Sequence, residues 1–202
     1  MIENRIGNLL EQKDLDAWIQ SCNCFCTMGS GVAKEVREKY PEVYEADLAT
    51  KSGDKKKLGT FSFAKTHDGK IGYNLYGQFN YGRDRQHTDY EAILNGLLKI
   101  KAHVKENISS TAKIGLPFKM GCVRGGGNWD TVKGILLHLF NYDPMTLVIC
   151  EFNDYKPSIS NFSKQDILTA KQAFKRFELM GNDVENEKYD MMGDKDETTR
   201  DL

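Results

Sequence analysis

The sequence predicts an α/β fold in which helices pack on a mixed β-sheet. Strand-like and helix-like segments alternate through the first 152 residues, and this alternation is typical of α/β sandwiches. Two glycine-rich loops, around Gly29–Gly31 and Gly121–Gly127, each lie where a predicted strand leads into a predicted helix. Ligands of open α/β sheets bind at such carboxyl ends of strands. The pattern therefore predicts a ligand site between the two loops.

The individual elements follow from apolar periodicity and from turn residues. Strands are expected at residues 14–22, 59–65, 71–76, 113–117 and 146–152. Helices are expected at residues 32–40, 42–50, 88–106 and 128–140. Asp68-Gly69 is a strong hairpin signal between the second and third strands. Thr88 is expected to cap the third helix in a capping box with Glu91. A polar, basic loop at residues 51–57 and a polar aromatic loop at residues 77–87 complete this part.

Length, charge and cysteine content narrow the class of protein. The 202 residues are enough for one domain with an appendage, and the net charge of -1 provides no global basic field for DNA or RNA. No apolar run reaches the roughly 18–20 residues of a membrane span, and the N-terminus lacks the apolar core of a signal peptide. The odd count of five cysteines argues for reduced thiols. We therefore expect a cytoplasmic protein without a membrane partner.

The cluster Cys22-x-Cys24-x-Cys26 has two interpretations, as a metal site or as small core residues. Zinc sites usually space their cysteines more widely and add a second pair or histidines later in the chain. No such partner pair occurs among the four histidines. We expect core residues, with no metal and no cofactor.

The two glycine loops suggest phosphate binding. Glycines before a helix allow backbone N–H groups to face a phosphate, and the helix dipole adds to the attraction. The second loop has four glycines in seven residues, which is a plausible phosphate nest. Neither loop is a Walker motif or a Rossmann fingerprint. A helix-entry turn and a flexible surface loop remain the alternatives for each loop taken alone. Together they predict a pyrophosphate-containing nucleotide as the ligand.

Three segments in order resemble the macro domain family. They are the stretch from Asp16 to Asn23 with Met28-Gly29-Ser30-Gly31-Val32-Ala33, the stretch Leu116-Pro117 to Asn128-Trp129, and Asn74-Leu75-Tyr76-Gly77-Gln78 with Tyr81-Gly82. The last is similar to the branch that includes ADP-ribose 1''-phosphate phosphatases. The resemblance covers about residues 1–153. It implies a three-layer α/β/α macro domain at residues 1–155 that binds ADP-ribose in a cleft at the edge of the sheet.

The resemblance also implies the residues of the site. Asn23 would hydrogen-bond the distal ribose, and Asn8 would stand where the family usually has an aspartate for the adenine amino group. Phe152 or Tyr155 would stack on the base, or else serve as ordinary core or surface aromatics. The full set of expected ligand-binding residues is Asn8, Leu9, Asn23, Gly29, Ser30, Gly31, Val32, Gln78, Pro117, Gly121, Cys122, Val123, Arg124, Gly125, Gly126, Gly127 and Phe152.

The expected chemistry is hydrolysis, most directly the removal of phosphate from ADP-ribose 1''-phosphate. One branch of macro domains uses a lysine and an aspartate, which would fall near Gln78 or Phe79 and near Gly125, and neither residue is present. Asn23, His87 and Asp84 are the candidate catalytic residues, although His87 and Asp84 could be ordinary loop residues. Two alternatives remain: a non-enzymatic ADP-ribose-binding module, and a hydrolase acting on ADP-ribosylated macromolecules. The basic loop at 51–57 could meet an acidic macromolecule or could be a solvated lysine run.

The C-terminal region has a different character. Residues 163–179 have the apolar spacing of one amphipathic helix, within an expected helical extension at 156–180. Residues 181–202 carry eight acidic and three basic residues with few large apolar ones, which is typical of a disordered acidic tail.

Overall fold

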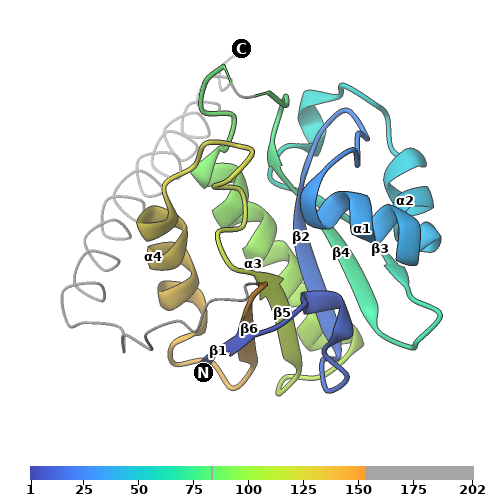
Figure 1. Cartoon of the computed structure of the whole chain (residues 1–202). Helices are drawn as coiled ribbons and strands as arrows, with labels where there is room; N and C mark the ends of the chain where they lie inside the picture. The colour runs from blue at the N-terminus through green and yellow to red at the C-terminus, as the bar shows by residue number, and fades with distance from the viewer. Residues whose placement is uncertain (83, 153–202) are drawn as a thin grey trace, which may run out of the picture.

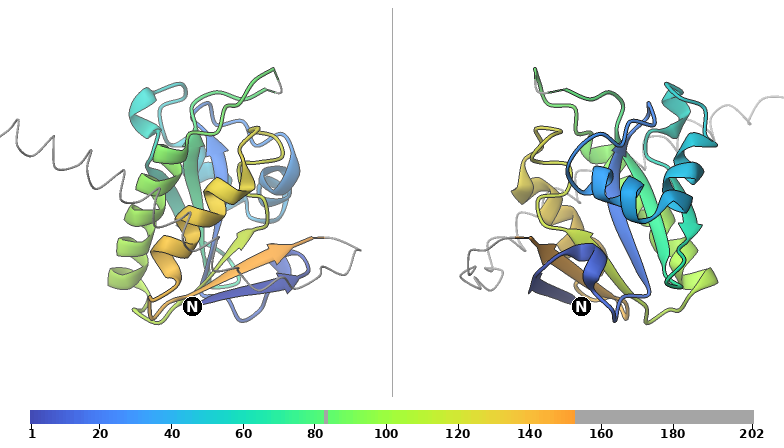
Figure 2. Two further views of the ribbon diagram at one scale, coloured as in Figure 1. Left: turned by 90° about the vertical axis from the view of Figure 1, so that its left-hand side faces the viewer. Right: turned by 45° about the vertical axis from the view of Figure 1, so that its right-hand side comes forward.

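The computed structural model describes residues 1–82 and 84–152, which form a six-stranded sheet between two pairs of helices (Figures 1 and 2). The expected C-terminal helix and acidic tail, and Tyr155, lie outside the described residues. The strands are β1 (Ile2–Ile6), β2 (Ala17–Asn23), β3 (Phe61–Lys65), β4 (Ile71–Gln78), β5 (Lys113–Pro117) and β6 (Thr146–Glu151). Their order in the sheet is β1-β6-β5-β2-β4-β3, and only β3 runs antiparallel to its neighbour. The predicted mixed sheet is confirmed.

The helices form the two outer layers (Figure 1). They are α1 (Gly31–Lys39), α2 (Pro41–Leu48), α3 (Tyr90–Asn107) and α4 (Trp129–Phe140), with short 3-10 turns η1 (Leu9–Glu11) and η2 (Lys55–Lys57). Side chains alternate across β2, so Ile19 packs with α3 and α4 while Trp18 packs with α1 and α2. Each face of the sheet therefore has its own buried apolar cluster, and the three-layer prediction is confirmed.

Some local predictions are wrong. Asp89 caps α3, because its side chain accepts a hydrogen bond from the Ala92 N–H at 3.0 Å. Thr88 is held in an extended bridge to Gln78, and its hydroxyl donates to the Gly121 carbonyl instead. The basic loop at 51–57 contains η2, and Lys57 within it is buried. The strand β1 carries little apolar periodicity and was not predicted from the residues; its place is fixed by parallel pairing with β6.

No helix in the described part of the chain has both the length and the apolar character needed to span a membrane.

Candidate functional site

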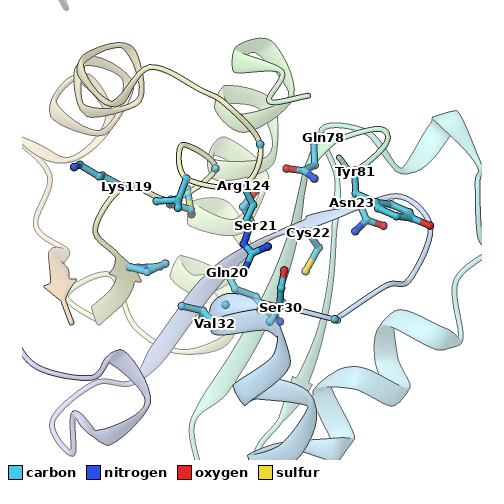
Figure 3. A pocket seen from close by; sticks show the side chains of 18 of the residues that line it. Gln20, Ser21, Cys22, Asn23, Ser30, Val32, Gln78, Tyr81, Lys119 and Arg124 are labelled. Atoms are coloured by element: carbon cyan, nitrogen blue, oxygen red, sulfur yellow. The ribbon is translucent and has the colours of Figure 1, made fainter. Parts of the chain in front are cut away.

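A cleft opens at the carboxyl ends of the three central strands, where Asn23, Gln78 and Pro117 are the last residues of β2, β4 and β5. Its volume is about 670 Å³, and Figure 3 shows its walls. Both glycine-rich loops line it. The lining residues are Gln20, Ser21, Cys22, Asn23, Thr27, Gly29, Ser30, Gly31, Val32, Ala33, Gln78, Tyr81, Gly82, Pro117, Phe118, Lys119, Met120, Gly121, Val123, Arg124 and Gly125. The predicted position between the loops matches this cleft.

The first loop presents the N-terminus of α1 to the cleft. Gly31 opens the helix with a φ of +59°, a conformation that favours glycine. Ser30 is the N-cap residue, but its side chain makes no capping hydrogen bond, and the first turn holds no acidic residue. Within the described part of the chain, the N–H groups of residues 29–32 donate to no acceptor. Free N–H groups and the helix dipole together attract an anion.

Asn23 is fixed within the first loop by hydrogen bonds in both directions. Its Oδ1 accepts from the Phe25 N–H at 2.8 Å, and its Nδ2 donates to the Thr27 hydroxyl at 2.7 Å. The side chain is buried at the end of β2 and lines the cleft. Its orientation is therefore set by the fold before any ligand arrives.

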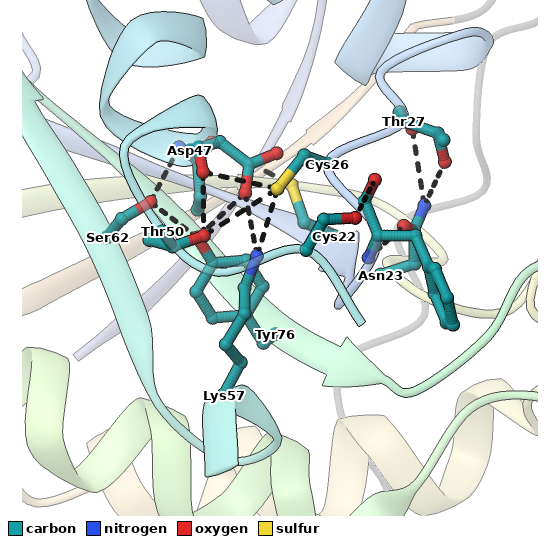
Figure 4. A network of polar contacts seen from close by, with 12 residues as sticks. Cys22, Asn23, Cys26, Thr27, Asp47, Thr50, Lys57, Ser62 and Tyr76 are labelled. Atoms are coloured by element: carbon teal, nitrogen blue, oxygen red, sulfur yellow. Dashed lines mark hydrogen bonds and ion pairs between the residues drawn. The ribbon is translucent and has the colours of Figure 1, made fainter. Parts of the chain in front are cut away.

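A buried polar network holds the far side of this loop (Figure 4). Cys26, which has a positive φ of 58°, places its Sγ 3.1 Å from the Lys57 ammonium and 3.2 Å from the Asp47 carbonyl. The Lys57 Nζ lies 3.3 Å from the Asp47 carboxylate and 4.3 Å from the centre of the Tyr76 ring. Because a non-glycine residue in this conformation persists only when its surroundings fix it, the network anchors the loop.

The second loop is shaped by contacts with the segment before α3. The Gly125 carbonyl accepts from the N–H groups of His87 and Thr88, and the Gly121 carbonyl accepts from the Thr88 hydroxyl. A Cβ added to Gly125 would lie 2.3 Å from the Thr88 Oγ1 and 2.6 Å from the Gly121 carbonyl oxygen. Only glycine fits there, so an aspartate at this position is sterically excluded. In the described residues, the N–H groups of 123–125 have no acceptor.

One cation points into the cleft from the second loop. The Arg124 side chain extends between the two loops, whereas Lys119 points away from the centre (Figure 3). No ion pair or hydrogen bond joins the Arg124 guanidinium to another described residue. A planar guanidinium matches the oxygens of a phosphate or carboxylate.

The floor of the cleft carries polar atoms that the protein leaves unsatisfied. Among the described residues, Gln20 Oε1 and Ser21 Oγ are buried without a hydrogen-bond partner. An unmade hydrogen bond on a buried group costs roughly 1–3 kcal/mol. Both residues line the cleft, but these two atoms themselves are buried. Cys22 lies beside them, but burial raises the pKa of its thiol well above the usual range, which argues against a nucleophilic thiolate.

The structure separates some predicted site residues from this lining. Leu9 is buried in the core under α1, and Cys122 packs against the other core with its Sγ directed at the Met120 carbonyl. Gly126 and Gly127 pack against the 85–88 segment. Phe152 is 82% exposed just after β6.

Asn8 is engaged in local structure at the end of β1. Its Oδ1 caps η1 by accepting from the Leu10 N–H at 2.9 Å, and its Nδ2 donates to the Glu35 carboxylate at 2.6 Å. Glu35 also pairs with Lys39 at 2.8 Å. Asn8 and Phe152 follow the paired strands β1 and β6, so both lie at the same end of the sheet.

His87 and Asp84 form a pair beside the cleft. His87 Nε2 lies 2.9 Å from Asp84 Oδ1, and the hydrogen bond to His87 lowers the pKa of the Asp84 carboxyl. The imidazole is 4% exposed, whereas the carboxylate is solvent-exposed. Neither residue lines the cleft, but both lie against Gly82, which is a lining residue. A Cβ added to Gly82 would be 2.8 Å from His87 Nε2.

Sequence reasoning missed several lining residues, chiefly Gln20, Ser21 and Tyr81. A signal was present for the first two, because they interrupt an otherwise apolar buried strand, and buried polar residues are informative. Tyr81 gave no such signal, because aromatic residues are common in surface loops. The cysteines behave as expected, since Cys22, Cys24 and Cys26 are free and buried.

Comparison with known proteins shows which family the chain belongs to. No protein-family model matches the sequence. The "Uncharacterized 17.5 kDa protein in tk-vs intergenic region" of Enterobacteria phage T4 is 40% identical over 120 residues, which cover 57% of this chain and 74% of the phage protein. The chain belongs to the family of this phage protein.

Comparison with solved structures identifies the fold of the chain. The macrodomain of Mycobacterium tuberculosis DarG is 24% identical with a TM-score of 0.62, covering 78% of this chain and 99% of that one. The macrodomain of Thermus aquaticus DarG is 21% identical with a TM-score of 0.60, covering 78% and 99%. Thermosipho africanus DarTG in complex with ADP-ribose is 18% identical with a TM-score of 0.63, covering 82% of this chain and 46% of that one. The chain has the macro domain fold.

Proposed function

We propose that the cleft binds ADP-ribose or a derivative, with the pyrophosphate held between residues 29–32 and 121–127. The observation that carries this proposal is the pair of opposed backbone segments in which the N–H groups of residues 29–32 and 123–125 donate to no acceptor among the described residues, with the Arg124 guanidinium between them. A pyrophosphate carries negative charge along its length and can accept hydrogen bonds from both sides. A solved structure of the same fold, Thermosipho africanus DarTG, contains ADP-ribose, which supports the choice of ligand.

The two ends of the ligand have different surroundings. Asn23 and Gln78 stand at the end that we assign to the distal ribose, because their amide side chains offer hydrogen bonds to hydroxyl groups. Asn8, Leu9 and Phe152 mark the end that we assign to the base. There the Asn8 oxygen retains one lone pair beside its bond to Leu10, so it could accept only one further hydrogen bond.

The proposed reaction is removal of phosphate from ADP-ribose 1''-phosphate. Water adds to phosphorus, the bond from phosphorus to the sugar oxygen breaks, and the products are ADP-ribose and inorganic phosphate. Arg124 and the loop N–H groups would stabilise the charge on the transferring group, and Asn23 would hold the ribose in position. The His87–Asp84 pair beneath Gly82 would assist proton transfer to the leaving oxygen.

A panel of ADP-ribose derivatives, analysed by mass spectrometry, tests the reaction. We expect phosphate release from the 1''-phosphate by the wild-type protein and loss of release in Asn23→Ala. Full rate in Asn23→Ala with unchanged folding would contradict the proposed site.

Arg124→Gln should weaken the binding of ADP-ribose, measured by calorimetry, by about 10- to 100-fold, the scale of a charge-assisted hydrogen bond. Lys119→Gln is the control for the loss of one positive charge, because Lys119 lines the cleft but its side chain points away from the centre (Figure 3).

A binding module without catalysis is the second candidate. The described residues that line the cleft include no carboxylate and no imidazole, so no general base touches a bound ligand directly. This candidate predicts calorimetric binding of ADP-ribose with no change in any member of the panel. Release of ADP-ribose from a modified macromolecule, detected on a gel, would instead favour the third candidate, an ADP-ribosyl hydrolase.

A further inference from the structure

A cysteine and a lysine that are far apart in the sequence meet in the buried network behind the first loop (Figure 4). The Cys26 Sγ lies 3.1 Å from the Lys57 Nζ. The same sulfur contacts the Asp47 carbonyl at 3.2 Å and the Thr50 hydroxyl at 3.6 Å. Cys26 and Lys57 are not among the described residues that line the cleft, so the proposed function makes no use of their contact.

The fold holds both atoms of this contact in place. The Lys57 Nζ lies 3.3 Å from the Asp47 carboxylate and 4.3 Å from the centre of the Tyr76 ring. Cys26 has a φ of 58°, which a non-glycine residue keeps only where its surroundings fix it. Groups held in contact react as if each were present at very high concentration. The sulfur and the nitrogen are therefore placed for a reaction with each other.

The pair is buried but not sealed from solvent. Cys26 is 8% exposed and Lys57 is 7% exposed, so a molecule little larger than water, such as hydrogen peroxide, has access to it. Peroxides convert a cysteine to a sulfenic acid, which condenses with a neighbouring thiol or nitrogen. A sulfenic acid at Cys26 would be screened from thiols in solution, and the Lys57 nitrogen would be in contact with it.

We propose that Cys26 and Lys57 form an oxidative modification site, in which a peroxide joins Sγ to Nζ through one oxygen atom. The separation of 3.1 Å is much longer than a direct sulfur–nitrogen bond. An inserted oxygen spans such a gap with a small movement of the two side chains, whereas a direct bond would require a larger one in a strained loop.

The reaction balances with two molecules of hydrogen peroxide. The first transfers an oxygen to Sγ and leaves as water, which gives the sulfenic acid. The Lys57 ammonium gives a proton to the Asp47 carboxylate, and the second peroxide transfers an oxygen to Nζ and leaves as water, which gives a hydroxylamine. The hydroxylamine oxygen then attacks Sγ, and the sulfenic hydroxyl departs as a third water. Sulfur and nitrogen each lose two electrons, which the two peroxides accept.

The link would fasten the segment that carries Asn23. The Asn23 side chain accepts from the Phe25 N–H and donates to the Thr27 hydroxyl, on either side of Cys26. Because Asp47 takes up the proton that Lys57 loses, no unpaired charge is left in the buried network.

Peptide mapping of the full-length protein by mass spectrometry, after treatment with hydrogen peroxide and then iodoacetamide in denaturant, tests this site. We expect the tryptic peptide with Cys26 to be joined to the peptide with Lys57, at their summed mass plus one oxygen and minus two hydrogens. Alkylated cysteines should fall from five to four, and a thiol reductant should separate the peptides and free Cys26. Burial raises the pKa of the Cys24, Cys122 and Cys150 thiols to about 11, which slows their oxidation.

The controls keep Lys57, because loss of its charge would leave Asp47 buried without a partner. Cys26→Ser should give no cross-link, whereas Cys24→Ser, which removes a neighbouring buried thiol, should give as much as the wild type. Circular dichroism checks that both variants are folded. Wild-type protein treated with peroxide in guanidinium should also give no cross-link, because only the fold brings the two residues together.

Three results would overturn the proposal. They are a Cys26 that gains two or three oxygens without joining Lys57, a disulfide between Cys26 and another cysteine, and a cross-link that forms equally in unfolded protein. None of these measurements uses ADP-ribose, so their outcome is independent of the proposed function.

Discussion

At the scale of single residues, two positions show how steric and electrostatic constraints shape the site. Gly125 occupies a space bounded by Thr88 and the Gly121 carbonyl. Lys57 is a charged side chain only 8% exposed, paired with Asp47 at 1%. Charges are rarely buried unless paired, and this pair lies directly behind the loop that carries Asn23. Both positions are therefore constrained by the geometry of the loops.

Gly125→Ala should destabilise the protein by about 1–3 kcal/mol, the cost of forcing a methyl group into a packed site. The contact with Thr88 should also distort the second loop and weaken ADP-ribose binding. Urea denaturation and calorimetry measure the two effects. Gly29→Ala is the control for stability, because a Cβ at Gly29 meets nothing within 4 Å. Equal free energies of unfolding for the two variants would show that the second loop can accommodate a methyl group at residue 125, contrary to the prediction.

Lys57→Met should destabilise the protein by about 3–5 kcal/mol, because it leaves the Asp47 carboxylate buried without its cation. Adding Asp47→Asn removes that charge, so the double variant should be more stable than Lys57→Met alone. Chemical denaturation of the single and double variants gives the coupling free energy. Lys55→Met, on the exposed side of the same turn, should change stability by no more than about 0.5 kcal/mol. A cost as small for Lys57→Met would contradict the buried pair.

At the scale of elements, the β3–β4 hairpin shows how a turn is joined to the rest of the fold. Asp68 accepts hydrogen bonds from the Thr66 hydroxyl at 2.6 Å and the Tyr40 hydroxyl at 3.3 Å, and it pairs with Lys70. Burial by itself would raise the pKa of the Asp68 carboxyl. The hydrogen bonds from Lys70 and Thr66 outweigh this effect and lower the pKa to about 2. The hairpin therefore depends on an ionised carboxylate that also reaches the residue between α1 and α2.

Acid should weaken this hairpin contact. Because the folded pKa of Asp68 lies below its ordinary value of 3.8, its contribution is fully present above about pH 4–5 and is lost as the pH falls toward 2. Asp68→Asn should therefore destabilise the protein at pH 6 and show less loss of stability between pH 4 and pH 2 than the wild type. Urea titrations at these three pH values measure the difference. Parallel pH profiles for the two proteins would rule out this role.

At the scale of the whole molecule, the described residues are sufficient for a complete sheet with both faces covered. In the part of the chain that the structure describes, two apolar clusters and the lining of the cleft are already in place. The N-terminal amine closes the far end of the sheet by donating to the carbonyls of Phe140, Asp143 and Met145. A domain boundary near residue 155 was expected from the change in composition, and it remains a prediction.

A protein of residues 1–155 should fold cooperatively and bind ADP-ribose within about twofold of the full-length chain. The expectation follows because every residue assigned to the ligand lies in this range. Saturating ADP-ribose at about 100 times Kd should add about 2.7 kcal/mol to the stability of either protein, which thermal denaturation detects as a raised Tm. A shortened protein that folds but loses ligand binding would place part of the site beyond residue 155.

The sequence alone determined the alternation of strands and helices, the positions of the two glycine loops and the place of Asn23 near the end of the strand before the first loop. These features are local, because periodicity, glycine content and strand ends can be read from neighbouring residues. The tertiary structure decided what depends on distant partners. Only the fold brings Cys26 to Lys57 and Asp47, turns Thr88 from a helix cap into a support for the second loop, and closes Gly125 to any side chain. It also joins Cys24 to Gly53 and Phe79, because hydrogen bonds between separate segments are set by packing and not by spacing along the chain.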